Sequence, residues 1–254
     1  MKVLAITQAR IGSTRLPEKI LKTVDNKTLL EIHLSRILKS KYITKLKVAT
    51  TNEEGSEKIV FIASKLGVEV HKGSIDNVLE RFYETAKPES PEWVVRLTSD
   101  CPLIDSSVID SVIELAISKN LDYASNALTP TFPDGLDVEV FKYTVLERAY
   151  KEATLNSEFE HVTPYIWKNS TYNGGNLFIS DCFKNNLDYS SIRMTVDTME
   201  DFWVIEKLVQ ILGIEKGWLE YVYVLKNNPQ IKEINKSYRR NEGYNKSIIN
   251  DDNG

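Results

Sequence analysis

Cysteine, histidine and long apolar runs are scarce in this sequence of 254 residues. Its two cysteines, Cys101 and Cys182, cannot build a disulfide framework, which favours a reducing compartment, and we expect the cytoplasm. Its three histidines lie far apart, so they do not predict a histidine metal cluster. No apolar segment approaches the roughly 20 residues of a membrane span. We therefore expect no membrane contact and no targeting segment.

The sequence also lacks an excess of positive charge. It contains 32 Lys and Arg against 36 Asp and Glu, a formal net charge of −4. A protein that grips nucleic acid through phosphate contacts usually carries a basic field, so we expect no nucleic-acid partner. Internal repeats and low-complexity segments are absent as well. The length suits one large α/β domain, and we predict a single domain over residues 1–254.

Two common phosphate-binding motifs, G-x-x-x-x-G-K-[ST] and G-x-G-x-x-G, are missing, which argues against a Walker ATPase and a Rossmann dehydrogenase. What stands instead is a basic loop at residues 7–19, directly behind the apolar run 3–6. A loop that leaves the carboxyl end of a buried parallel strand is where open α/β sheets bind ligands. The loop contains a flexible glycine, two hydroxyl side chains and three cations: Gly12, Ser13, Thr14, Arg10, Arg15 and Lys19. We interpret it as a nucleoside-triphosphate loop; the alternative is a solvated basic loop.

Strand-like and helix-like segments alternate through the first two-thirds of the chain, which predicts an α/β fold with a mixed central sheet. The expected helices are 26–40, 53–66, 76–86 and the segment after Asp105; the expected strands are 3–6, 46–51, 68–70, 93–98, the segment from Tyr123, 136–140 and 192–196. Asp105 is a plausible helix cap. Capping-box patterns at Thr144 and Thr198 predict two further helix starts.

The region 126–190 predicts a small β/α flap over the site, because its first part is rich in Thr, Pro and Gly and looks like an inserted loop. The last residues, 245–254, are expected to be disordered.

The basic loop reads Q-A-R-x-G-S-T-R-L-P-x-K and resembles the signature of the spore-coat polysaccharide (SpsF) type of cytidylyltransferases, relatives of the enzymes that make CMP-sialic acid and CMP-Kdo. Further matching segments follow in the expected order at 96–104, 134–139, 160–165 and 196–201. The resemblance implies a Rossmann-like nucleotidyltransferase fold, a three-layer sandwich similar to that of GT-A glycosyltransferases. It also implies a homodimer, since related CMP-sugar synthetases pair through an extension of the flap.

Two aspartates stand at the ends of predicted strands, Asp100 after 93–98 and Asp197 after 192–196. Two such carboxylates could share one hard cation, and Mg²⁺ usually takes one or two carboxylates plus substrate phosphate. The resemblance implies that both hold Mg²⁺ against the triphosphate. The alternatives are a turn cap for Asp100 and a helix cap for Asp197.

The resemblance also assigns the nucleotide site. Arg15, Lys19 and Asp100 are the predicted catalytic residues: Arg15 and Lys19 would neutralise charge on the phosphates, and Asp100 would hold the Mg²⁺ ion. The predicted nucleotide-binding residues are Gln8, Ala9, Arg10, Gly12, Ser13, Thr14, Thr51, Asn52, Arg96, Thr98 and Ser99. The resemblance implies that the cytosine base is recognised by backbone groups of the basic loop and by a later segment, either 50–52 or 96–99.

For the acceptor, the candidates are Asp134, Asp137, Glu139 and His161, with Glu160 beside them. Asp137 and Glu139 could equally be the polar face of a strand, and His161 could satisfy a helix N-terminus. The cations that could bind a sugar carboxylate are Arg81, Arg96 and Arg193.

Together these features predict a Mg²⁺-dependent enzyme that transfers CMP from CTP to an acidic sugar, a nonulosonic acid by resemblance, and releases pyrophosphate during surface-polysaccharide synthesis. Two alternatives stay open. A glycosyltransferase of related fold would use a D-x-D metal motif, and Asp134 and Asp137 are one residue too far apart for it. The other is a non-catalytic nucleotide-binding protein.

Overall fold

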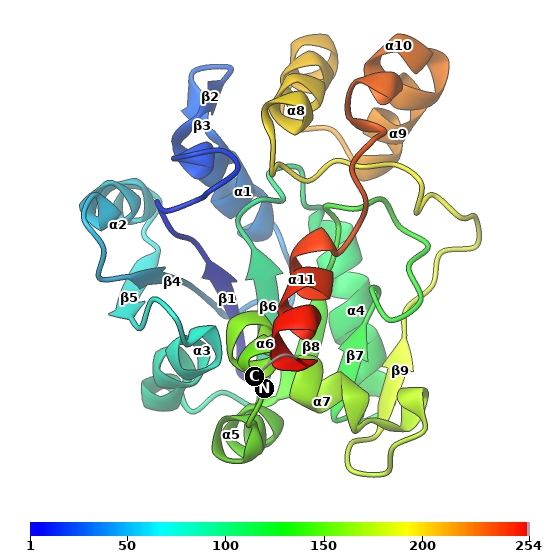
Figure 1. Ribbon diagram of the computed structural model, residues 1–254. Coiled ribbons are helices and arrows are strands. Elements are labelled where there is room, and N and C mark those ends of the chain that lie inside the picture. Colours follow the sequence, from blue (N-terminus) through cyan, green and yellow to red (C-terminus); the bar gives the residue numbers. More distant parts are fainter. Residues whose placement is uncertain (253–254) are drawn as a thin grey trace.

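The fold is built on a seven-stranded sheet in a computed structural model that describes residues 1–252 (Figure 1). The strand order is β5-β4-β1-β6-β8-β7-β9. The strands are β1 Val3–Gln8, β4 Lys45–Thr51, β5 Glu69–Gly73, β6 Trp93–Thr98, β7 Tyr123–Ser125, β8 Glu139–Lys142 and β9 Ser180–Cys182. Only β8 runs antiparallel to its neighbours, β6 and β7. The predicted mixed sheet is therefore confirmed.

Helices cover both faces of this sheet. They are α1 Leu29–Ile37, α2 Ser56–Lys65, α3 Val78–Ala86, α4 Ser106–Ser118, α5 Tyr143–Glu152, α6 Asn156–His161, α7 Pro164–Lys168, α8 Met199–Leu212, α9 Trp218–Asn227, α10 Pro229–Lys232 and α11 Glu242–Asp252. Alternate residues of β1 face opposite cores: Val3 and Ala5 pack with α1, α2, α4, α8 and α9, while Leu4 and Ile6 pack with α3, α5, α6 and α7. The result is the predicted three-layer sandwich.

The helix α1 begins later than expected. Residues 23–28 form a small hairpin of β2 Thr23–Val24 and β3 Lys27–Thr28, turned through Asp25 and Asn26 at positive φ. Thr28 then caps the helix: its hydroxyl accepts from the Glu31 amide, and the Glu31 carboxylate accepts from the Thr28 amide. This capping box starts the helix at Leu29 and not at residue 26.

Two predicted strands around the flap are wrong in whole or in part. The strand expected at 136–140 is formed only from Glu139, because the Asn126 side chain bonds both Leu136 and Val138 and replaces the sheet ladder there. Residues 192–196 form no strand; one isolated bridge joins Asp134 and Arg193.

The capping prediction holds at Thr198, whose hydroxyl accepts from the Asp201 amide at the start of α8. It is wrong at Thr144, which lies inside α5. Asp105 caps α4 as predicted, since its carboxylate accepts from the Ser107 amide.

The C-terminal residues also differ from expectation. Residues 242–252 form the helix α11, which packs beside α6 (Figure 1). Disorder is therefore the wrong prediction for residues 245–252, because contacts with the flap order them; residues 253 and 254 lie outside the described residues. Whether residues 126–190 behave as a flap within one domain stays a prediction. Among the described residues, no helix has the length and apolar character needed to cross a membrane.

Candidate active site

A cavity of about 930 Å³ opens at the carboxyl ends of β1 and β6. These strands are parallel neighbours, so the loops that follow Gln8 and Thr98 meet at one edge of the sheet. The flap helices α6 and α7 and residues 239–244 close the other sides. Most predicted site residues line this cavity: Gln8, Ala9, Arg10, Ser13, Thr14, Arg15, Lys19, Arg96, Thr98, Ser99, Asp100, Asp134, Asp137, Glu139, Glu160, His161 and Asp197.

Three predicted nucleotide-binding residues, Gly12, Thr51 and Asn52, are not among the residues that line this cavity. Thr51 is buried in β4, and Asn52 is exposed beyond it. Residues 75–78 and Arg81, at the start of α3, line the cavity instead. Of the two segments expected to recognise the base, only 96–99 therefore borders this space. Arg81 was among the candidate cations, but the contribution of residues 75–78 was missed, because nothing in their sequence marks them as ligand contacts.

Glu53 is a second contribution that the sequence analysis missed. Its carboxylate oxygen accepts hydrogen bonds from the backbone amides of Ile11 at 2.7 Å and Gly12 at 3.0 Å. A Cβ atom at Gly12 would come within 2.9 Å of the same carboxylate. A larger residue at position 12 would therefore displace the Glu53 carboxylate, which fixes the turn of the basic loop.

At the loop end of the cavity, the Lys19 ammonium bridges two carboxylates. Its Nζ lies 3.2 Å from Asp100 Oδ2 and 2.8 Å from Asp197 Oδ1. Although burial opposes the charged forms, the Lys19 ammonium lowers the pKa of Asp100 to about 2, and the two carboxylates raise the pKa of Lys19. Near neutral pH, Asp100 is a carboxylate and Lys19 an ammonium ion.

The tertiary fold brings Asp197 to Asp100 without the expected strand. The amide of Val196 donates to the Asp100 carbonyl at 2.7 Å, so a single backbone bond aligns the two segments. Asp100 and Asp197 therefore lie close together as predicted, although the strand predicted at 192–196 is not formed.

The donor set suits a hard cation. Two carboxylates converge on one ammonium nitrogen, which marks the space between them as a place that stabilises positive charge. Within the described part of the chain, no group of three or more His, Cys, Asp or Glu could hold a metal by itself. Mg²⁺ often binds with only one or two carboxylates and completes its shell with water and substrate phosphate, so Asp100 and Asp197 fit it.

His33, a fully buried residue of α1, forms a hydrogen bond with the turn that contains Asp100. Its Nδ1 lies 2.8 Å from the Cys101 carbonyl and its Nε2 lies 2.8 Å from the Thr7 hydroxyl. The carbonyl can only accept, so Nδ1 donates and Nε2 accepts in the neutral ring. Burial lowers the pKa of His33 to about 4, which keeps the ring neutral.

Arg193 lies at the centre of a buried ion cluster next to the carboxylate pair. It bonds Asp134 at 2.7 Å, Asp201 at 2.8 Å and Asp197 at 3.2 Å. Burial and the neighbouring Asp137 carboxylate raise the pKa of Asp134 to about 6. Since Arg193 already pairs with three carboxylates, it is not a free cation for a substrate acid.

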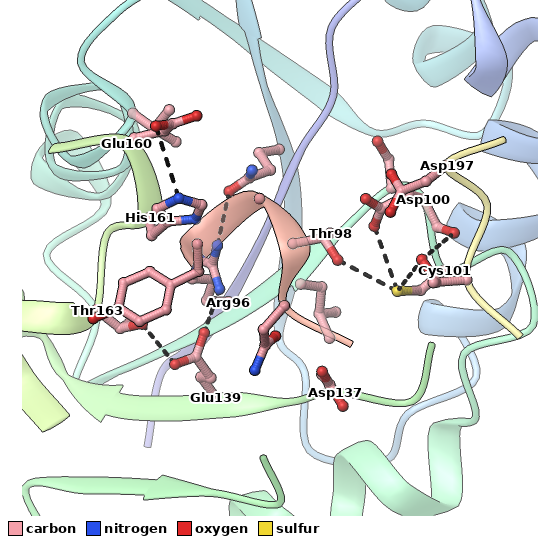
Figure 2. A pocket seen from close by; sticks show the side chains of 18 of the residues that line it. Arg96, Thr98, Asp100, Cys101, Asp137, Glu139, Glu160, His161, Thr163 and Asp197 are labelled. Atoms are coloured by element: carbon pink, nitrogen blue, oxygen red, sulfur yellow. Dashed lines mark hydrogen bonds and ion pairs between the residues drawn. The ribbon is translucent and has the colours of Figure 1, made fainter. Parts of the chain in front are cut away.

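Glu139 organises the flap end of the cavity. Its carboxylate accepts from the hydroxyls of Tyr123 and Thr163, both at 2.6 Å, and forms an ion pair with Arg96. The alternative that Glu139 belongs to the solvent-exposed polar face of a strand is thereby excluded, because its side chain is buried. Arg96 is committed to this pair. Figure 2 shows Glu139, Thr163 and His161 toward one side of the view and Asp100 and Asp197 toward the other.

His161 is the last residue of α6, so it does not satisfy a helix N-terminus. Its Nε2 lies 3.0 Å from the Ser247 hydroxyl, and burial lowers the pKa of the ring. Arg81 differs from the other candidate cations: it forms no ion pair with any described residue. Its guanidinium donates to the Ser74 carbonyl at 2.5 Å, and burial lowers its pKa to about 10. Of Arg81, Arg96 and Arg193, only Arg81 therefore keeps its charge unpaired.

A family model described as "Cytidylyltransferase" matches residues 4–242. "Uncharacterized protein MJ1063" of Methanocaldococcus jannaschii is 38% identical over 245 residues, which cover 94% of this chain and 97% of that protein. "Spore coat polysaccharide biosynthesis protein SpsF" of Bacillus subtilis is 31% identical over 89% of this chain and 95% of its own. The predicted family resemblance is confirmed.

Among solved structures, a cytidylyltransferase from Leptospira borgpetersenii superposes with a TM-score of 0.86 at 35% identity, covering 94% of this chain and 100% of that chain. A CMP:2-keto-3-deoxy-manno-octonic acid synthetase in complex with CTP superposes with a TM-score of 0.64 at 14% identity, covering 83% and 99%. The second likeness shows the shared fold.

Proposed function

Because this chain belongs to the cytidylyltransferase family, we propose that it transfers CMP from CTP to the hydroxyl of a sugar acid, with Mg²⁺ bound and pyrophosphate released. The observation that carries the proposal is the cluster of Lys19, Asp100 and Asp197 beside the basic loop, in one cavity. A carboxylate pair for a hard cation and several cations for phosphate are what this reaction needs, and here they share one space.

In the proposed reaction, an acceptor oxygen attacks the α-phosphorus of CTP as the bond from that phosphorus to the β-phosphate oxygen breaks. Bound Mg²⁺ would supply Lewis-acid stabilisation of the phosphate oxygens. Arg10, Arg15 and Lys19 line the same side and would neutralise the β- and γ-phosphates that leave as pyrophosphate. No covalent enzyme intermediate is required.

The hydroxyl proton of the acceptor also needs a destination. Asp134 and Asp137, two residues of the flap, line the cavity, and burial raises the pKa of each carboxyl. A carboxylate whose pKa moves toward neutrality is a better proton acceptor at neutral pH, so either one suits this step. Mutation of each would separate the two.

The acceptor class rests on the relatives. One is named for spore-coat polysaccharide biosynthesis, and several shorter matches are named 3-deoxy-manno-octulosonate cytidylyltransferases. An acceptor that fits both kinds of name is a sugar acid used in surface polysaccharide. A homodimer and a cytoplasmic location remain part of the proposal.

The first test measures thermal stability with CTP, UTP, ATP, GTP, a CMP-sugar and a UDP-sugar, each with and without Mg²⁺. A ligand at 100 times its dissociation constant stabilises the folded state by about 2.7 kcal/mol, and no acceptor need be known. We expect a selective, Mg²⁺-dependent shift with CTP. A shift only with a UDP-sugar would favour a glycosyltransferase, and CTP binding without pyrophosphate release on any sugar acid would favour a non-catalytic protein.

A matched pair of variants sharpens this test. Lys19→Met removes the ammonium ion that would contact phosphate, and CTP affinity should fall by about 10-fold or more. Lys58→Met is the control: Lys58 is half exposed and pairs with Glu18, and neither residue lines the cavity. Equal CTP affinity in the two variants would show that the basic loop does not bind the triphosphate.

A further inference from the structure

The last described residues of the chain form one wall of the cavity. We define residues 239–252 as the C-terminal arm; it contains α11 and lies mostly beyond residue 242, where the family match ends. Arg239, Asn241, Glu242, Gly243 and Tyr244 all line the cavity. A segment at the edge of the family match thus lines the same cavity as Lys19, Asp100 and Asp197.

The arm is tied to the flap at several points. The Ser247 hydroxyl lies 2.7 Å from a Glu160 carboxylate oxygen and 3.0 Å from His161 Nε2. Asp251 accepts from the Ser157 amide at 3.1 Å. At the other end of the arm, the Arg240 guanidinium donates to the Asp137 carboxylate. The contacts are specific and polar, so the position of the arm is fixed by the flap.

Aromatic packing brings Tyr244 into the site. Its ring centroid lies 5.2 Å from that of His161, edge to face, and 5.7 Å from that of Trp167. All three side chains line the cavity. The Tyr244 hydroxyl is buried and has no hydrogen-bond partner among the described residues. Together the three rings form an aromatic face, which we call the aromatic wall.

The aromatic wall belongs to the end of the cavity away from the carboxylate pair. His161 lies on the opposite side of Arg96 from Asp100 and Asp197 in Figure 2. Under the proposed function, the triphosphate occupies the side of Lys19 and the two aspartates. The cytidine lies beside residues 96–99, and the part of the cavity at the aromatic wall is then left for the acceptor.

We propose that the C-terminal arm forms the acceptor wall, and that the Tyr244 ring is the surface on which the carbon skeleton of the sugar acid packs. This assignment rests on the proposed function and deepens it. Sugar rings expose C–H groups that pack on aromatic faces, while their hydroxyls bond polar neighbours. Here Glu160, Ser247 and His161 supply polar atoms directly beside the aromatic wall.

The test compares Tyr244→Ala with wild type, using CTP and two acceptor probes, 3-deoxy-manno-octulosonate and N-acetylneuraminate. Loss of the ring removes contact with a part of the acceptor that does not react. KM for the accepted probe should rise about 10-fold or more, with the CTP dissociation constant unchanged within about twofold. Tyr244→Phe should keep KM within about threefold, because it retains the ring.

Tyr223→Ala is the matched control, since Tyr223 is 70% exposed on α9 and does not line the cavity. It should leave both constants unchanged. Circular dichroism establishes that each variant is folded; if Tyr244→Ala does not fold, Tyr244→Leu takes its place. An unchanged acceptor KM, or a loss of CTP affinity as large as the rise in acceptor KM, would overturn the proposal that the C-terminal arm forms the acceptor wall. Turnover of neither probe by the wild type would overturn the proposed acceptor class and this assignment with it.

Discussion

At the Lys19 end of the cavity the ion pairs reach solvent, whereas around Arg193 they are almost fully buried. The side chains of Lys19, Asp100 and Asp197 are 15–28% exposed, while those of Arg193 and Asp201 are 9% and 0% exposed. Partly exposed ion pairs can exchange partners at modest cost, but a buried charge that loses its partner keeps its desolvation penalty. The ion pairs of Lys19 can therefore give way to substrate or metal. Those of Arg193 stabilise the fold.

The largest effect should follow from Asp100→Asn. This change removes one of the two proposed cation ligands, and turnover should fall by about 10³-fold, the loss typical of one key electrostatic contact. Because Lys19 keeps Asp197 as an ion-pair partner, the protein should stay folded, with a lower melting temperature. Pyrophosphate release and thermal unfolding are measured together. Metal-dependent turnover within tenfold of wild type would remove Asp100 from the reaction.

Arg193→Met should show the opposite pattern and unfold the protein more easily. It strands the fully buried Asp201 carboxylate, and breaking such a pair costs about 3–5 kcal/mol. Arg15→Met is the comparison, because Arg15 is 37% exposed and its pairs contribute about 0–1 kcal/mol. Urea unfolding measures both. If both variants lost the same free energy of unfolding, the buried and the partly exposed ion pairs would not differ in their contribution to stability.

The pH dependence of the free energy of unfolding tests His33, which forms a hydrogen bond with the turn that contains Asp100. The pKa of His33 is about 4 in the folded protein and 6.5 when unfolded, so the unfolded state binds more protons between these values. The contribution of His33 to stability should therefore be lost as pH falls from about 6.5 to 4, with a slope of up to about 1.4 kcal/mol per pH unit, partly offset below about pH 6 by Asp134, whose raised pKa has the opposite effect. Urea unfolding from pH 5 to 7.5 measures it.

His33→Gln should remove most of this slope, while His71→Gln, at a half-buried site, should change it less. A wild-type slope retained in His33→Gln would mean that another group titrates.

The smallest effect is expected for Glu242→Gln. Glu242 lies 3.5 Å from Arg15 in a solvent-exposed pair, so stability should change by less than about 1 kcal/mol. Removal of this carboxylate leaves Arg15 freer to meet phosphate, and CTP affinity should rise by up to about fivefold, more at low salt. Isothermal titration at two salt concentrations checks this. A fall in CTP affinity would mean that Glu242 contacts the nucleotide itself.

The accuracy of the sequence predictions differs between the two halves of the site. The strand 93–98 is predicted to the residue as β6, and the basic loop follows β1 as expected, because continuous apolar runs and parallel neighbours determine both. The strand expected at 192–196 is wrong, since a single bond from the Val196 amide to the Asp100 carbonyl does the aligning. Such a bond between distant segments leaves no local pattern.

What the sequence by itself determined is the family, the layered α/β fold, the basic loop and the two aspartates, since local periodicity and contiguous motifs encode these features. Only the tertiary structure decided that Glu53 holds the loop, that Arg193 is already neutralised and that Tyr244 reaches His161. The contacts of Glu53 with Ile11, of Arg193 with Asp134 and of Tyr244 with His161 each join residues more than 30 positions apart. Their partners are chosen by packing and burial in three dimensions, and a side chain's own neighbours in sequence carry no record of that choice.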